Sequence, residues 1–202
     1  MPITRDDIVR ALAIRGEVVP DQLPESLVAE SGTVSELVDE LVAERVAEKP
    51  GGQIRLSASG KLAATQLFAA DRASVGDDRA AQLLEQFHEL DGRMKALVTA
   101  WQVRDVGGEQ VLNDHTDAAY DERILGDLAA LHGDTVTFLE PLTSMRRFAV
   151  YSARLSRALD AARTDQRYVA SPRVDSYHSV WFELHEDLIR LAGKKRSEAT
   201  AG

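Results

Sequence analysis

The most regular pattern of apolar and polar positions lies between Thr33 and Leu56. Valine and leucine recur there at spacings of three and four residues, which predicts an amphipathic helix over residues 34–46. The residues of this apolar face are Val34, Leu37, Val38, Leu41 and Val42. Thr33, followed by Glu36, predicts a capping box at the start of the helix, because each side chain can accept a hydrogen bond from an unpaired backbone N–H.

A β-hairpin is predicted directly after this helix. Residues 46–49 and 53–56 have the alternation of two short extended segments. Pro50-Gly51-Gly52 between them fixes one φ angle and then supplies two residues that tolerate positive φ, as a tight turn requires. Helix, strand, turn and strand is the order of the back half of a winged helix, which places its last helix in a DNA groove and its hairpin along the DNA backbone.

Helices are also predicted over residues 4–14, 21–29 and 60–73. Thr4 and Asp7 form a second candidate capping box, at the start of the first helix. The second helix should begin late or in two pieces, because the prolines at positions 20 and 24 are tolerated only in a first turn. Ser57 or Ser59 is the expected N-cap of the last helix. We therefore expect a winged helix with a three-helix body and a β-hairpin wing.

The helical pattern breaks at residues 74–77, where we expect a domain boundary. Beyond it the sequence predicts helices over 78–103, 120–142 (one helix or a pair), 148–162 and 175–192, with an irregular loop at 105–118. Short connections between amphipathic helices are typical of an antiparallel bundle. The predicted fold is mainly α, with a winged-helix domain at 1–75, a helical bundle domain at 76–193 and a flexible tail at 194–202.

Charge bears directly on DNA binding. The chain has a formal net charge of −9, and residues 1–75 hold 8 basic and 12 acidic side chains. The solvent face of the predicted 34–46 helix carries Ser35, Glu36, Asp39, Glu40, Ala43 and Glu44. Carboxylates there would face the phosphates, whereas DNA-binding proteins use lysine and arginine to release counterions. The candidate DNA contacts are Ser35, Lys49, Arg55 and Lys61. DNA is thus a candidate partner that the acidic helix face disfavours.

Several classes of protein are not indicated by the sequence. Without cysteine, the chain can form no disulfide, thiol nucleophile or cysteine-ligated zinc site. It has no G-x-S-x-G turn, no phosphate-binding glycine loop, no signal-peptide pattern at its start and no apolar run of about 20 residues. We expect a cytoplasmic protein that is not an enzyme and that uses no cofactor and no metal.

The predicted bundle contains candidates for a small-molecule pocket. Aromatic and histidine side chains suited to it are Trp101, His115, Tyr177, His178, Trp181 and His185. Aromatic residues at helical spacing also serve simply as core, which is the alternative. Residues seven apart on a helix lie about 10.5 Å apart along its axis, so His178 and His185 cannot readily share a metal ion. Asp175 is the expected N-cap of the last helix, and Thr116 or Asp117 that of the 120–142 helix.

Two parts of the chain resemble known families. The passage Arg55-Leu56-Ser57-Ala58-Ser59-Gly60-Lys61 looks like the R-L-T-x-x-G-R turn of MarR-type transcriptional regulators, and the resemblance covers residues 4–73. Residues 97–191 resemble an actinobacterial helical family through Trp101-Gln102-Val103-Arg104, the segment NDHTDAAYD at 113–121 and the segment DSYHSVWFELHEDL at 175–188. Modules similar to this second part occur attached to phosphoenolpyruvate-utilising phosphotransferases. Their phosphohistidine and glycine-rich motifs are absent here, so the resemblance implies regulation or partner contact and no catalysis.

Two functional hypotheses follow. The first is a homodimeric winged-helix transcriptional regulator whose helical domain serves dimerisation or effector sensing. The alternative is a protein-interaction module that regulates a phosphoenolpyruvate-utilising phosphotransferase and does not touch DNA. Neither hypothesis requires a membrane.

Overall fold

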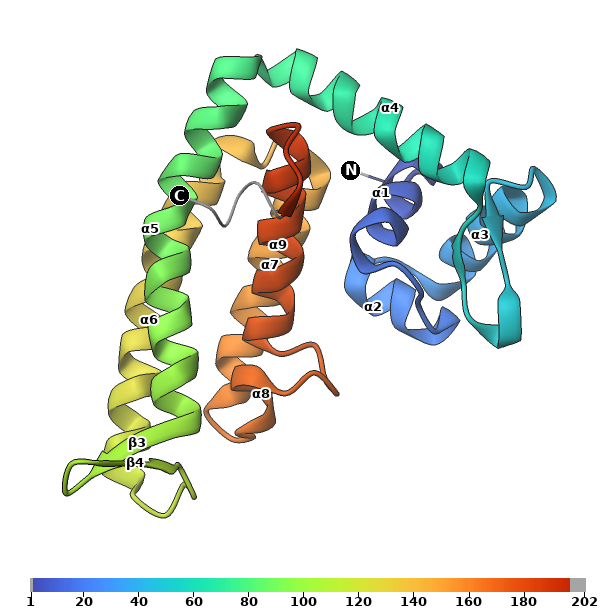
Figure 1. Cartoon of the computed structure of the whole chain (residues 1–202). Helices are drawn as coiled ribbons and strands as arrows, with labels where there is room; N and C mark the ends of the chain where they lie inside the picture. Colours follow the sequence, from blue (N-terminus) through green and yellow to red (C-terminus); the bar gives the residue numbers. More distant parts are fainter. Residues whose placement is uncertain (1, 197–202) are drawn as a thin grey trace. The chain divides into compact units, whose positions relative to one another are not determined.

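The computed structural model describes residues 2–196 and is mainly helical, as the sequence predicted (Figure 1). Its contacts divide the described chain into two compact units, the first formed by residues up to Leu84 and from Glu183 onward, the second by Glu85–Phe182. The predicted boundary at 74–77 coincides with a break between two helices at Gly76 (φ 91°), whereas the contacts divide the chain within α5 (Asp77–Gln102) and α9 (Tyr177–Leu191). The limits 1–75 and 76–193 therefore stay predictions. Most of the predicted tail lies outside the described residues.

The first unit begins with α1, and its sequence explains where this helix starts and stops. The complete elements of this unit are α1 (Arg5–Arg15), the 3-10 turn η1 (Pro20–Gln22), α2 (Leu23–Leu27), α3 (Ser31–Ala43), β1 (Ala47–Glu48), the 3-10 turn η2 (Pro50–Gly52), β2 (Arg55–Leu56) and α4 (Ala58–Val75). Thr4 Oγ1 accepts from the backbone N–H of Asp7 at 3.3 Å, and the Asp7 carboxylate accepts from the Thr4 N–H at 2.9 Å. The predicted capping box at Thr4 is confirmed. The second predicted helix does form in two pieces, η1 and α2.

The helix α3 differs from its prediction at both ends. It starts at Ser31, its N-cap is Glu30, and no side chain caps it. The predicted capping box of Thr33 and Glu36 is therefore wrong: the Val34 N–H already bonds the Glu30 carbonyl at 3.1 Å, which places Thr33 inside the first turn. The helix also ends at Ala43 and not at residue 46, because Arg45 adopts a positive φ of 61° that turns the chain toward the hairpin.

The predicted hairpin is confirmed. β1 and β2 pair antiparallel, with Ala47 opposite Leu56 and Glu48 opposite Arg55. Gly51 and Gly52 have φ values of 57° and 84° in the turn, which only glycine adopts without strain. A third segment joins the pair, since Val18 and Ile54 exchange backbone hydrogen bonds of 2.9 and 2.8 Å.

The core of the first unit lies between α1, α2, α3, α4 and the hairpin. Its buried members are Ile8, Val9, Leu12, Val18, Leu23, Leu27, Val34, Val38, Leu41, Ala47, Ile54, Leu56 and Ala64. Ser57 caps α4, since its Oγ accepts from the Gly60 N–H at 3.1 Å. Gly60 lies against the carbonyl of Val46, so that α4 starts in close contact with the hairpin.

The second unit is formed by helices and one further hairpin. Its complete elements are β3 (Val103–Val106), β4 (Glu109–Leu112), α6 (Ala118–Leu139), the 3-10 turn η3 (Glu140–Leu142), α7 (Arg146–Ala162) and α8 (Arg167–Ala170), to which α5 and α9 contribute the turns between Glu85 and Phe182. Within this unit α6 and α7 pack side by side, and the hairpin extends from the end of α5 (Figure 1). None of the helices in residues 2–196 has a stretch long and apolar enough to span a lipid bilayer.

Two predictions for the second unit are wrong. Residues 105–118, predicted as an irregular loop, contain most of the β3–β4 hairpin, which turns at Gly107 and Gly108. All four residues of β4 are exposed, so the strand has no buried face to leave an alternating pattern. Asp175 does not cap α9. Ser176 does, since its Oγ accepts a hydrogen bond from the Ser179 N–H at 3.2 Å, while the Asp175 carboxylate accepts a hydrogen bond from Arg154 Nε. Of the two predicted caps of α6, Thr116 and Asp117, the structure has Asp117, which accepts from the Tyr120 N–H at 3.1 Å.

Candidate functional site

The outer face of α3 is acidic and open to solvent. Val34, Val38 and Leu41 are buried beneath the helix and fix its orientation. The opposite face presents Ser35, Glu36, Asp39, Glu40, Ala43 and Glu44, all of them exposed. We call this surface the α3 acidic face. Its composition is as predicted, with four carboxylates where a DNA-reading helix would need donors for base edges and phosphates.

Three cations near this face are already paired with carboxylates. Lys49 Nζ lies 2.7 Å from Asp39 Oδ1, and Arg55 Nε lies 2.7 Å from Glu48 Oε1. Arg5 binds Glu44 through its guanidinium, and this hydrogen bond holds the pKa of the Glu44 carboxyl below its ordinary value. Two of the four candidate DNA contacts, Lys49 and Arg55, are therefore engaged within the first unit. An approaching phosphate would have to compete with the carboxylates for these cations.

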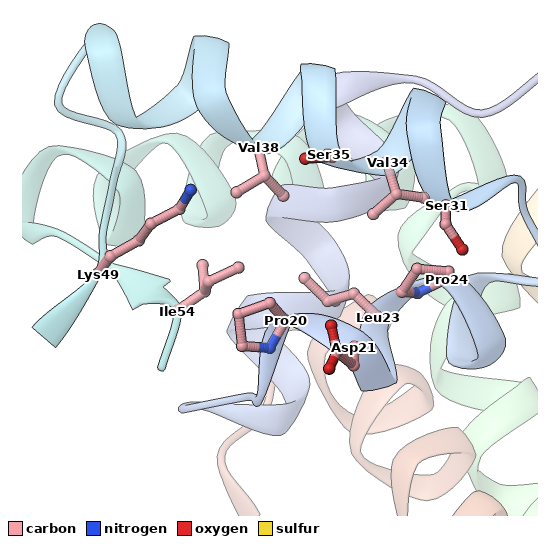
Figure 2. Close-up of a pocket in the computed structure, with 10 residues that line it drawn as sticks. All are labelled: Pro20, Asp21, Leu23, Pro24, Ser31, Val34, Ser35, Val38, Lys49 and Ile54. Atoms are coloured by element: carbon pink, nitrogen blue, oxygen red, sulfur yellow. The ribbon is translucent and has the colours of Figure 1, made fainter. Parts of the chain in front are cut away.

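The other two candidate contacts remain accessible. Lys61 is exposed on the first turn of α4, and the described residues offer it no ion pair. Ser35 is exposed on α3 and lies on the rim of a pocket of about 370 Å³ between the η1–α2 segment, α3 and the hairpin (Figure 2). Of the four candidate contacts, one lysine and one serine are thus left to bind phosphate, which is a weak set of contacts.

Trp101 and His115 belong to a polar cluster where the β3–β4 hairpin joins α6. The two rings lie 4.5 Å apart between centroids, and Trp101 is buried while His115 is half-buried. His115 Nδ1 lies 2.9 Å from Asp121 Oδ2, and the amide of Asn113 donates to Asp121 Oδ1 at 2.9 Å and to the Trp101 carbonyl at 3.1 Å. Because the carboxylate can only accept, Nδ1 carries a proton and donates it to Asp121. The cluster ties the hairpin to α5 and α6.

Tyr177 and Trp181 belong to a second, separate group. Trp181 stacks on Phe87 at 4.9 Å between centroids and lies 6.1 Å from Tyr177, and both residues of α9 are buried. The Trp181 Nε1–H donates to the buried carboxylate of Asp91 at 3.0 Å. Asp91 and Trp101 are ten residues apart on α5, about 15 Å along its axis. The contacts thus place the predicted pocket aromatics in two groups, and a ligand role for either stays a prediction.

Three further histidines, His132, His178 and His185, are at least half-buried. His132 Nε2 lies 3.2 Å from Ser156 Oγ, whose hydroxyl donates to the Ser152 carbonyl, and His132 Nδ1 lies 3.3 Å from the Tyr177 hydroxyl. This arrangement assigns the proton to Nε2 and leaves Nδ1 as the acceptor of the Tyr177 O–H. Burial lowers the pKa of His132 and of His178, and raises that of the Tyr177 hydroxyl. His185 is buried in α9.

No family model, curated protein or solved structure matches this chain. A functional assignment therefore depends on the geometry and on the sequence resemblances. In residues 2–196, no group of three or more histidine, aspartate or glutamate side chains is placed to hold a metal ion. The sequence does not indicate that Asp91 and Asp121 are buried, because a single acidic residue in a helical pattern is usually solvent-exposed.

Lowering the pH from about 7 to 5 is expected to destabilise the second unit through His132 and His178. Their folded pKa values lie below the ordinary value of about 6.5 that applies in the unfolded chain. Between the two values the unfolded chain binds more protons, so the stabilisation is complete above about pH 6.5 and is lost as the pH falls toward the folded pKa. Protonated His132 would also put a second N–H against the Tyr177 hydroxyl.

Urea unfolding followed by tryptophan fluorescence measures this effect, because both tryptophans lie in the second unit. The variant His132→Gln keeps a hydrogen-bonding side chain but cannot titrate. Its midpoint should fall less steeply between about pH 6.5 and 5 than that of the wild type. Equal slopes in the two proteins would contradict the assignment to His132.

Proposed function

We propose that this chain is a protein-interaction module whose first unit is a winged helix, and that the α3 acidic face binds a basic surface of a partner protein. The order α1, α2, α3, hairpin and α4, with the Val18–Ile54 bridge beside the hairpin, supports the winged-helix arrangement. The observation that carries the proposal is the pairing of Lys49 with Asp39, at 2.7 Å. Lys49, the lysine best placed to bind DNA, instead neutralises Asp39, and the α3 acidic face keeps a negative charge.

The nature of the partner follows from the charge. A surface with several carboxylates attracts a partner rich in lysine and arginine and speeds their encounter, and added salt weakens the attraction. The resemblance of residues 97–191 to modules attached to phosphoenolpyruvate-utilising phosphotransferases makes such an enzyme the first partner to test. In this assignment the helical second unit has no catalytic role.

A second candidate function is a DNA-binding regulator. The arrangement of three helices and a hairpin favours it, as do the exposed Ser35 and Lys61. Electrophoretic mobility shifts with the gene's own upstream DNA, at low and at moderate salt, separate the two candidates. Salt-sensitive binding of the wild-type chain to that DNA would favour the regulator and count against the module.

The double variant Glu36→Lys/Glu40→Lys is expected to weaken partner binding about tenfold or more, because it reverses two charges on the α3 acidic face. The measurement is a pull-down or a calorimetric titration with a phosphoenolpyruvate-utilising phosphotransferase from the same organism. The matched control Glu122→Lys/Asp127→Lys makes the same charge change on exposed positions of α6 and should bind as the wild type. Equal loss in both variants would show that net charge, and not this face, governs binding.

A further inference from the structure

The pocket beside the α3 acidic face is built from three segments of the first unit. Its apolar floor is formed by Leu23 of α2, Val34 and Val38 of α3, and Ile54 next to β2 (Figure 2). Each of these side chains is at most 3% exposed, so the floor is held by the core beneath it. A volume of about 370 Å³ lies in the range of small-molecule sites, which run from about 300 to 1,000 Å³.

The charges on the rim of this pocket are not balanced. Asp21 is exposed on η1 and forms no ion pair or side-chain hydrogen bond with any residue in the described range 2–196. Lys49, the cation of the rim, lies on Asp39 at 2.7 Å and is already neutralised. The N-terminus of α3 at Ser31 contributes at most about half an elementary charge, which offsets only part of the Asp21 carboxylate. The mouth of the pocket therefore has a net negative charge.

We propose that this pocket binds a ligand with an apolar body and one cationic head. The body would cover the floor formed by Val34, Val38 and Ile54, and an ammonium or guanidinium would pair with Asp21. Ser31 and Ser35 offer hydroxyls to a neutral polar group of the ligand. The same chemistry is presented by a free amine and by a lysine or arginine side chain with an apolar neighbour.

Occupation of the pocket would have a mechanical consequence. Pro20 and Pro24 stiffen one wall, while the opposite wall includes Lys49 on the hairpin (Figure 2). A bound ligand would contact η1, α2, α3 and the hairpin at once. It would therefore restrain the hairpin relative to α3, and of the α3 acidic face it would contact Ser35 and none of the carboxylates.

Methyl NMR spectra of the full chain test the proposal with three probes that share a phenyl group. Phenethylammonium is cationic, 2-phenylethanol is neutral and 3-phenylpropanoate is anionic. Phenethylammonium should shift the methyl signals of Val34, Val38 and Ile54 saturably, and about three- to fivefold more tightly than the neutral probe, as expected of one exposed ion pair. The anionic probe should bind most weakly. Equal or tighter binding of the anion would overturn the proposal.

Two variants tie the result to the site. Asp21→Asn should remove the preference for the cation and leave the apolar contact, whereas the control Glu30→Gln, exposed at the N-cap of α3, should not change it. Ser35→Phe, at an exposed position on the rim, should fill the pocket and abolish the methyl shifts in a chain that still folds. Shifts that persist unchanged in both Asp21→Asn and Ser35→Phe would place the binding elsewhere and overturn the proposal.

The two sources of the ligand are separated by a second titration. The capped tripeptide acetyl-Leu-Lys-Leu-amide stands for a partner side chain, and phenethylammonium for a free amine. Whichever saturates the three methyl signals at the lower concentration identifies the source, and either result supports the site. If neither saturates them, the proposal is wrong.

Discussion

The substitution Gly60→Ala is expected to destabilise the first unit by about 3 kcal/mol. A Cβ at this position would lie 2.0 Å from the carbonyl oxygen of Val46 and 3.1 Å from Leu56 Cδ2. The Val46 oxygen belongs to the backbone and already accepts from the Ser57 N–H at 3.0 Å and from Ser57 Oγ at 3.1 Å. It cannot move aside without breaking the cap of α4, so the alanine must push α4 away from the hairpin.

The matched control for Gly60 is Gly32→Ala in the first turn of α3. No heavy atom lies within 4 Å of a Cβ built there, so the methyl group meets open space. An alanine in a helix restricts the unfolded chain and should stabilise the unit by about 0.5 kcal/mol. The two glycine-to-alanine substitutions are thus expected to change the stability of the first unit in opposite directions.

The measurement must report on the first unit, and intrinsic fluorescence does not. Both tryptophans and all four tyrosines lie in the second unit. Urea unfolding should therefore be followed through the methyl signals of Ile8 and Ile54, which are buried in the core of the first unit. If the midpoint of Gly60→Ala lies within the error of the wild type, α4 does not start in contact with the hairpin as described.

Two nearly identical sequence patterns show what local reasoning can and cannot predict. Thr4 with Asp7 and Thr33 with Glu36 both fit a capping box, and only the first forms. The second fails because Ser31 and Gly32 adopt helical geometry, so the helix starts before Thr33. A capping motif marks a position where a helix can begin, and the residues before it decide whether the helix has already started.

Elements whose apolar residues form a buried stripe could be predicted from the sequence, whereas elements without such a stripe could not. The helices and the β1–β2 hairpin have apolar periodicity or turn glycines that are visible in the sequence. Six of the eight strand residues of the β3–β4 hairpin are exposed, so only the Gly107-Gly108 pair marked it in the sequence. Contacts of Asn113 with the Trp101 carbonyl and with Asp121 join it to α5 and α6.

The candidate site was predictable in composition but not in pairing. The apolar stripe of α3 fixes which acids face solvent, and the structure has them there. The sequence does not show that Lys49 folds back onto Asp39, because that contact depends on how the hairpin leaves the helix. The position of Arg45 at positive φ sets this geometry. The contact between Asp91 and Trp181 could not be predicted either, because the two residues are ninety positions apart in the sequence.

The substitution Arg154→Met is expected to destabilise the second unit by about 3 kcal/mol. Arg154 is only 2% exposed, and its guanidinium binds the Asp175 carboxylate through Nε at 3.0 Å and through a terminal nitrogen at 2.6 Å. Methionine retains the apolar stem but removes the charge, which leaves Asp175 without this partner. Because the Asp175 side chain is 17% exposed, water can reach it, and the loss should stay near the lower end of the range for broken buried ion pairs.

Unfolding in urea, followed by the fluorescence of Trp101 and Trp181, reports this change directly in the second unit. The control Arg163→Met, exposed at the end of α7, should stay within about 0.5 kcal/mol of the wild type. The double variant Arg154→Met/Asp175→Asn should be more stable than the sum of its two single changes predicts, by about 1 kcal/mol, because the uncompensated carboxylate is gone. Strict additivity would show that the ion pair between Arg154 and Asp175 contributes nothing to the stability of the unit.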